Sequence, residues 1–282
     1  MLERRSLAFS LLVYGSALVL AAFILAPIAW LLIMSISQTN DLTTIPLRWL
    51  PRSLDLHRYR EILSLAENSV GFAFLSALRN SLLVAGIAAL GALLVAIPAA
   101  WSVSRAQGKL NPPLYLVVAT YMLPPVALVV PIYFALSALG ALNSVFSLAI
   151  VYLSILAPFT TWLLKSNFDH VPTEIELAAM IDGARLDQIL RRITLPLAAP
   201  ALTTAGLFAF LLAWDEFFYA LLFTAKDSKT LPVFIADLAG GRVADYGLIA
   251  TAGVMASLPP VLIGFFLQKS LVSGLTAGGV KG

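Results

Sequence analysis

The chain has 282 residues, of which 60% are hydrophobic and only 12% are charged. Average globular proteins carry about 25% charged residues, so this composition excludes an ordinary soluble domain. The formal net charge of +3 is too small to indicate a nucleic-acid partner, and the absence of cysteine excludes disulfides and thiolate metal sites. His57 and His170 fall in different predicted loops, so we predict no metal site.

Five charge-free runs organise the chain, at residues 6–40, 80–104, 110–164, 193–214 and 246–268. About 20 apolar residues cross a bilayer as a helix, so four runs hold one span each and the longest holds two. In the longest run, Gly140 and the Asn143-Ser144 pair supply turn chemistry between the two spans. The sequence therefore predicts an all-α membrane protein with six transmembrane helices.

Residues 1–36 are predicted to hold the N-terminus and the first transmembrane helix. The apolar run is longer than the roughly 7 to 15 residues of a signal-peptide core, so we expect it to remain uncleaved. Arg4 and Arg5 favour a cytoplasmic N-terminus, because Lys and Arg collect on that side. With six spans, the C-terminal tail at 269–282 and the polar loop at 165–196 also face the cytoplasm.

Residues 37–79 form an external connection of mixed charge, with a short helix expected from 55 to 65. Two interpretations fit this segment. It could lie on the membrane surface as an amphipathic element, or it could contact a delivered solute or the carrier of that solute.

Residues 80–282 form the core, with the other five predicted spans. The second span carries alanines four residues apart, at Ala88, Ala92, Ala96 and Ala100. This spacing puts them on one helix face, where small side chains allow another helix to approach closely. We predict that this face packs on a neighbouring helix.

Prolines interrupt three of the later spans, at Pro124, Pro125, Pro131, Pro158, Pro259 and Pro260. Proline removes a backbone donor and kinks a helix. Two interpretations fit: kinks that serve packing alone, or broken helices that line a solute path, as membrane transporters use.

The polar loop at 165–196 is the part of the core that offers a soluble surface. Thr173 and Glu176 have capping-box spacing, which predicts a helix from Glu174, and Gly183 then predicts a break before a second helix that stops at Pro196. A small-residue face suits insertion into a groove on another protein. The other interpretation is a loop folded against its own bundle.

The loop resembles the EAA loop of permease subunits from binding-protein-dependent ABC importers. The residues at the matching offsets are Ala178, Ala179, Gly183, Ile193, Leu195 and Pro196. Leu177 stands where the pattern has Glu, and Glu176 lies one position earlier. Residues 79–84 and 99–105 also resemble the family, and the tail at 274–282 is similar to the sugar-importing, maltose-type G permease branch.

The resemblance implies a multi-pass permease of the bacterial cytoplasmic (inner) membrane that forms a heterodimer with a second permease subunit. It implies two cytoplasmic ATP-binding subunits, which would use ATP and Mg, and an external or periplasmic solute-binding protein, with no cofactor bound by this chain. The solute would be a sugar or sugar derivative, or alternatively a polyol or glycerol-phosphate-like molecule. The residues implied for ATPase coupling are Glu174, Glu176, Leu177, Ala178, Ala179, Asp182, Gly183, Ala184, Ile193, Leu195 and Pro196.

Trp214-Asp215-Glu216-Phe217 is similar to the family's Trp-Asn-Glu/Asp-Phe, with Asp215 where Asn is usual. Acids in a span are expected to be functional. However, Asp215 lies about 28 Å along a helix from Pro196 at about 1.5 Å per residue, near the outer interface. It either caps a helix at that interface or lines an outer vestibule. The candidate solute-path residues are Asn80, Pro124, Pro125, Trp214, Asp215 and Glu216.

Catalytic chemistry is not predicted. The glycines at 274 and 279 have phosphate-loop spacing, but no Ser or Thr follows Lys281. No catalytic set of side chains is evident, so the chain is not expected to be an enzyme. A self-contained secondary transporter is the alternative from another class.

Overall fold

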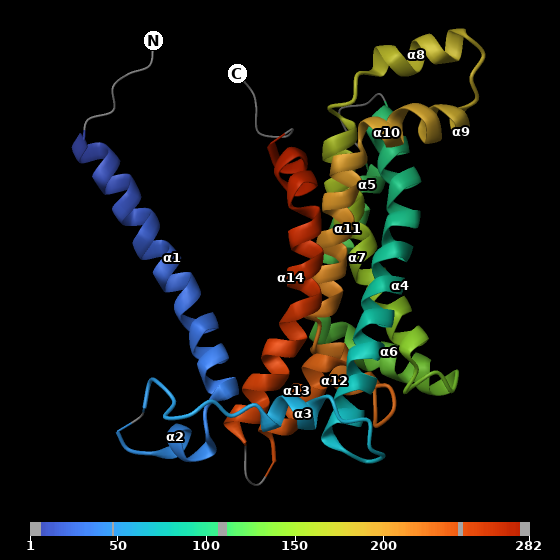
Figure 1. Ribbon diagram of the computed structural model, residues 1–282. Helices are drawn as coiled ribbons and strands as arrows, with labels where there is room; N and C mark the ends of the chain where they lie inside the picture. Colours follow the sequence, from blue (N-terminus) through green and yellow to red (C-terminus); the bar gives the residue numbers. More distant parts are fainter. Residues whose placement is uncertain (1–6, 47, 107–111, 242–244, 277–282) are drawn as a thin grey trace. The chain divides into compact units, whose positions relative to one another are not determined.

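The computed structural model describes residues 7–46, 48–106, 112–241 and 245–276, and all regular structure in these residues is helical (Figure 1). The predicted all-α class is therefore confirmed. The chain divides into two compact units. The first comprises Met1–Leu75 and Ile235–Ser257, and the second comprises Ser76–Phe234 and Leu258–Gly282.

The first unit contains α1 (Leu7–Ile36), α2 (Thr39–Thr43) and α3 (His57–Ile62). It also holds the start of α4 (Val70–Arg105) and parts of α13 (Leu231–Ala239) and α14 (Tyr246–Thr276). The short helix expected between 55 and 65 is confirmed as α3. The second long helix begins at Val70, ten residues before the predicted start at Asn80.

The side chain of Arg58 in α3 is fully buried. Its guanidinium donates to the Ser37 carbonyl at 2.6 Å, to Thr39 Oγ1 at 2.7 Å and to Asp245 Oδ2 at 3.2 Å. A buried charge is tolerated when it is paired and hydrogen-bonded in this way. Arg58 therefore ties α3 to the end of α1 and to the residue that precedes α14.

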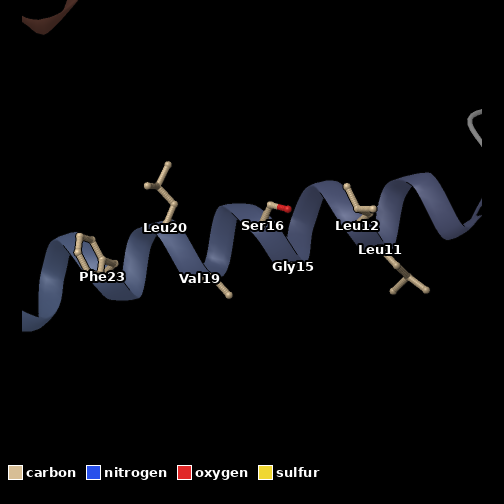
Figure 2. A pocket seen from close by; sticks show the side chains of 7 residues that line it. All are labelled: Leu11, Leu12, Gly15, Ser16, Val19, Leu20 and Phe23. Atoms are coloured by element: carbon tan, nitrogen blue, oxygen red, sulfur yellow. The ribbon is translucent and has the colours of Figure 1, made fainter.

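The α1 helix is apolar on all sides, and its most apolar stretch has no buried residue. Figure 2 labels the residues that line a shallow surface of this helix. All seven come from α1 itself, from Leu11 to Phe23, so this surface is open and is not an enclosed site. Such a helix suits a lipid or protein environment.

The second unit contains most of α4, followed by α5 (Pro112–Tyr121), α6 (Pro125–Ala138) and α7 (Val145–Phe168). Next come α8 (Thr173–Ile181), α9 (Leu186–Ile189), the π-helix η1 (Leu190–Thr194) and α10 (Leu195–Leu197). Then follow α11 (Ala199–Trp214) and α12 (Phe218–Phe223), and the unit also holds the start of α13 and the C-terminal part of α14. In Figure 1, α8 and α9 lie at one end of α4, α7 and α11, and α6 and α12 lie towards the other end.

The core of the second unit forms where α4, α7 and α11 meet. Ala88, Ala92, Ala96 and Ala100 of α4 are all fully buried, so the predicted packing face is confirmed. Two of these alanines share a cluster with Leu164, Phe168, Val171, Ala198 and Ala205. The small side chains allow close approach of the helix backbones.

Four helices of the described chain are long and apolar enough to cross a membrane: Phe9–Ile36, Val70–Arg105, Val145–Phe168 and Tyr246–Lys269. A fifth is added if the bent pair Leu186–Leu197 and Ala199–Trp214 forms one span. The six predicted spans are therefore not all seen as single helices. The third is divided into α5 and α6 at residues 122–124, where Pro124 and Pro125 lack the amide donors that a continuous helix needs.

The turn predicted at 140–144 is confirmed between α6 and α7. Gly140 and Asn143 have φ angles of 62° and 60°, a left-handed conformation that suits these two residue types. Ser144 caps α7 by accepting from the Ser147 amide at 3.3 Å. Pro131, Pro158 and the pair Pro259-Pro260 lie inside helices α6, α7 and α14, respectively.

Candidate functional site

The polar loop forms two short helices with a break at Gly183, as predicted. Gly183 has a φ of +85°, and its amide donates to the Met180 carbonyl at 3.0 Å. The Ala184 amide donates to the Ala179 carbonyl at 2.9 Å. This pair of bonds is the Schellman motif, which ends helices at a left-handed residue, usually glycine. Gly183 therefore terminates α8 and lets the chain turn into α9.

The predicted capping box at the start of α8 is wrong. The helix begins at Thr173, its N-cap residue is Pro172, and it has no side-chain cap hydrogen bond. Glu174 is exposed in the first turn, whereas Glu176 is 3% exposed and points into the unit. The carboxylate of Glu176 is drawn away from the helix N-terminus because stronger, charged donors lie on the inner side.

The Glu176 carboxylate accepts four hydrogen bonds. Arg105 donates from Nε to Oε2 at 2.7 Å and from Nη2 to Oε1 at 2.9 Å, a bidentate ion pair. Thr194 Oγ1 donates to Oε1 at 2.5 Å, and Trp101 Nε1 donates to Oε1 at 3.3 Å. Burial raises the pKa of Glu176, but the bonds from Arg105, Thr194 and Trp101 together outweigh burial and hold the pKa below its ordinary value. The group is therefore ionised at neutral pH.

Arg105 also donates hydrogen bonds to residues at the end of α7 and just after it. Its Nη1 donates to the Phe168 carbonyl and to Ser104 Oγ, both at 3.0 Å, and its Nη2 donates to the Val171 carbonyl at 3.4 Å. Ser104 in turn donates to Asp169 Oδ1 at 2.7 Å. The sequence pattern places Arg105 at a helix end with Trp101 one turn earlier, but it gives no sign that Thr194 or Glu176 joins them.

Large apolar side chains are exposed on α8 and α9, beside exposed charged residues such as Arg185 and Asp187. These apolar side chains are Ile175, Leu177, Met180, Ile181 and Leu186, with Ile181 87% exposed. Leu177, at the position where the EAA pattern has Glu, belongs to this surface. Ala178, Asp182 and Gly183 are also exposed, and Ala179 and Ala184 are half-buried. We call these residues of α8, α9 and their connection the outer surface of the loop.

The last part of the loop departs from the prediction that Pro196 ends the second helix. Ile193 lies in η1, and Leu195 and Pro196 lie in α10, which continues to Leu197. The helical axis bends by 81° between Leu197 and Ala199. Leu195 packs against the buried cluster of α4, α7 and α11, whereas Pro196 is exposed.

Among the candidate solute-path residues, Asn80 makes contacts within the chain. Its Nδ2 donates to the carbonyls of Asp227 and Lys229 at 2.9 and 3.0 Å, and it is 7% exposed. The next residue, Ser81, accepts from the Leu231 amide at 2.8 Å, at the start of α13. These bonds support a structural role for Asn80 in fixing the loop before α13.

Trp214 is the last residue of α11, and Asp215 and Glu216 lie between α11 and α12. Trp214 is buried and stacks on Phe210 with ring centroids 5.6 Å apart, while Asp215 is exposed. The Glu216 carboxylate accepts from the Tyr219 and Ala220 amides at 3.0 and 3.3 Å. Asp215 is the C-cap residue of α11, and its amide donates to the Leu211 carbonyl at 3.0 Å. The Glu216 carboxylate caps the first amides of α12.

Pro124 and Pro125 lie at the start of α6, where Pro124 is the N-cap residue. The Pro125 carbonyl accepts from Tyr219 Oη at 3.2 Å. Tyr219 therefore connects the break between α5 and α6 to the helix that Glu216 caps. Among the described residues, no group of three or more His, Asp or Glu side chains could hold a metal ion.

Comparison with known proteins gives the context of these features. The family model of the binding-protein-dependent transport system inner membrane component matches residues 92–277. This range includes the polar loop, with Glu176, and the residues that donate to its carboxylate. The sulfoquinovosyl glycerol transport system permease protein SmoH of Agrobacterium fabrum is 35% identical over 92% of this chain and 89% of its own length. The trehalose/maltose transport system permease protein MalG of Thermococcus litoralis is 34% identical over 96% of each chain.

A solved structure shares the fold. The crystal structure of a bacterial ABC transporter involved in the import of the acidic polysaccharide alginate has a chain that matches with a TM-score of 0.75 at 22% identity. The match covers 94% of this chain and 98% of that chain. With a family match over most of its length and relatives above 30% identity, the chain belongs to the family of binding-protein-dependent transport system inner membrane components.

Proposed function

We propose that this chain is a permease subunit of an ATP-driven ABC importer and lines the transmembrane path of a sugar or sugar derivative. It pairs with a second permease subunit, receives solute from an external solute-binding protein and is driven by two cytoplasmic ATP-binding subunits. Family membership supports this class of transporter and argues against a self-contained secondary transporter.

The observation that carries the proposal is the exposed apolar surface on the polar loop. Leu177, Ile181 and Leu186 are each more than half exposed on helices at one end of the second unit. Aqueous surfaces rarely leave several large apolar side chains together without a partner. The outer surface of the loop is therefore a docking site for an ATP-binding subunit, which receives a helix in a groove. With Leu177 in place of Glu, shape and burial dominate this contact over charge.

Co-purification tests the docking site. Leu186→Glu puts a charge on the outer surface of the loop, and we expect it to reduce the amount of ATP-binding subunit recovered with the tagged chain at least about tenfold, because a buried unpaired charge is strongly unfavourable. Leu65→Glu makes the same change at a residue 77% exposed in the first unit and should recover the wild-type amount. Equal recovery with both variants would refute the docking site.

The solute class rests on the names of the relatives. SmoH is named for sulfoquinovosyl glycerol, MalG for trehalose and maltose, and the solved importer for alginate. These are carbohydrates or carbohydrate derivatives, so a sugar is proposed, with a polyol or glycerol-phosphate-like solute as the second candidate. Uptake of labelled mono- and disaccharides, glycerol and glycerol phosphate in cells with and without this chain distinguishes the two classes.

We further propose six spans, with α5 and α6 together forming the third, and both termini in the cytoplasm. The apolar run from residue 110 to the turn at Gly140 supports one crossing with a proline break. The chain has no cysteine, so single cysteines can be labelled without background. In spheroplasts, an impermeant maleimide should label Leu54→Cys directly and Asp187→Cys only after permeabilisation. The opposite pattern would invert the topology.

A further inference from the structure

Glu176 is the one buried residue of α8, a helix that the structure describes in full. Every other residue of α8 is exposed or half-buried. In addition to the position of α8 beside α9 and η1, the Glu176 carboxylate hydrogen-bonds this helix to α4 and to η1. Glu176 is therefore the buried side chain that attaches α8 to the membrane helices of this unit.

The donors to that carboxylate come from two different parts of the chain. Trp101 and Arg105 lie on the last turns of α4, and Thr194 closes η1, which leads through α10 into α11. Arg105 also holds the Phe168 and Val171 carbonyls after α7. One buried ion pair therefore joins α8 to the ends of α4, α7 and η1.

We infer that Glu176 and Arg105 form a joint that positions α8 on the bundle, so that α8 and the ends of α4 and η1 move as one body. This inference rests on the proposed docking of the loop and names the residues through which a displacement of α8 reaches the membrane helices. Glu176 and Arg105 are positioning residues and do not themselves contact the partner, because their side chains face inward.

The chemistry of the pair favours this role over simple stabilisation. A buried ion pair carries a desolvation cost, and well-packed apolar residues often stabilise a fold equally well. A bidentate guanidinium fixes both the distance and the plane of the carboxylate, which an apolar contact does not. Thr194 and Trp101 fix the same oxygen from two further directions, so the carboxylate has one defined orientation.

Hydrogen exchange on the full chain in nanodiscs tests the joint directly, with matched variants on one helix. Glu176→Gln removes the charge and presents an amide donor to the Arg105 donors. We expect exchange of the α8 amides, residues 177–182, to accelerate about tenfold or more, while α7 and α11 exchange as in the wild type. Glu174→Gln makes the same chemical change at an exposed residue and should leave the exchange of α8 unaltered. Equal hydrogen exchange of α8 in the two variants would contradict the inference that Glu176 and Arg105 position this helix.

A second readout uses the importer isolated through a tag on this chain. With Glu176→Gln, the ATP-binding subunit should still be isolated together with this chain and should still hydrolyse ATP, because docking is retained. Solute uptake by the cells should fall about tenfold, because the motion of α8 no longer reaches the membrane helices. A general folding defect would instead lower the recovered chain and accelerate exchange in every helix, which would contradict the inference. Thr194→Val removes one donor at nearly constant shape and should give a smaller change in the same direction.

The experiments distinguish a failure of the proposed docking from a failure of the Glu176–Arg105 joint. If no ATP-binding subunit is recovered with the wild-type chain, the proposed docking is wrong. The hydrogen exchange of α8 in Glu176→Gln and Glu174→Gln still tests whether Glu176 and Arg105 position this helix. If the subunit is recovered and Glu176→Gln changes neither the exchange of α8 nor uptake, docking stands and the joint is wrong.

Discussion

The guanidinium of Arg58 lies directly against the backbone of Gly247, so that a Cβ at residue 247 would collide with it. The same guanidinium pairs with Asp245, two residues earlier in the chain. Glycine at 247 is therefore required by the buried arginine, and not by the conformation of its own backbone, which lies inside α14. The first turn of α14 is built around this side chain.

Gly247→Ala should destabilise the first unit by about 1 to 3 kcal/mol, because the buried guanidinium must shift and its hydrogen bonds to Ser37 and Asp245 lengthen. Gly253→Ala, in the same helix, places its Cβ in ordinary contact with Leu31 at 3.6 Å and should be tolerated. Thermal unfolding of both variants in detergent measures the difference. Equal melting temperatures would show that Arg58 adapts without cost.

Gly183 has a different requirement, since nothing lies within 4 Å of a Cβ built at this position and its φ is +85°. Gly183→Ala should therefore cost about 1 kcal/mol through backbone strain alone, and Gly183→Asn should cost less. Gly183→Pro cannot adopt this φ, so we expect it to insert in the membrane but to lose transport.

The matched control for this series is Gly86→Ala, which also has no atom within 4 Å of the added Cβ but lies inside α4. Alanine is favoured over glycine in a helix, so this variant should be neutral or stabilising. Hydrogen exchange at the end of α8, together with uptake, ranks the variants. Normal transport by Gly183→Pro would contradict the role of the break.

The lowered pKa of Glu176 predicts how the attachment of α8 depends on pH. The folded carboxylate binds a proton less readily than the unfolded one, so its contribution to stability is complete above the ordinary value of 4.5 and is lost as pH falls through the lower, folded pKa. The α8 attachment should therefore be unchanged at neutral pH and weaken only below pH 4.5.

Fluorescence of Trp101, whose indole donates to Glu176, reports this titration. A variant in which the other four of the five tryptophans are replaced by Phe should show an emission change confined to the acidic range. Glu176→Gln in the same background should give a flat profile. A transition in the single-tryptophan chain near neutral pH would contradict the ion pair.

Replacement of the carboxylate by an amide should have different effects at the neighbouring acids Asp215 and Glu216. Glu216→Gln weakens the cap of α12 and should destabilise the chain by about 1 kcal/mol. Asp215→Asn should leave the melting temperature unchanged, because its side chain is exposed at the end of α11. If Asp215→Asn also leaves the KM for uptake unchanged, Asp215 does not line an outer vestibule. An unchanged melting temperature for Glu216→Gln would contradict the cap.

Much of the fold could be predicted because it depends on local patterns. Apolar runs predicted the long helices, the four-residue spacing predicted the alanine face, and the glycine at 183 predicted the end of α8. Pro124 was predicted to kink or break its span, whereas the 81° bend before Ala199 was not predicted, because an apolar run gives the length of a segment and not its direction.

The site could be predicted only in part. The letters Thr-x-x-Glu at 173–176 fit both a capping box and an inward-facing carboxylate. The choice between them depends on Arg105, which lies 71 residues away in the sequence. Arg58 and Asp245, 187 residues apart, are likewise a pair that no local pattern indicates. Long-range pairs of charges are the features of this chain that required the structure.

The most direct test of the central claim, that the outer surface of the loop receives the ATP-binding subunit, is photo-crosslinking at Ile181, which is 87% exposed. A benzophenone maleimide on Ile181→Cys in the assembled importer should capture a subunit that binds ATP, whereas the same probe on Leu54→Cys, 71% exposed in the first unit, should not. Capture from residue 181 alone is the predicted result. Equal capture from both residues, or none from residue 181 in a complex that hydrolyses ATP, would contradict the claim.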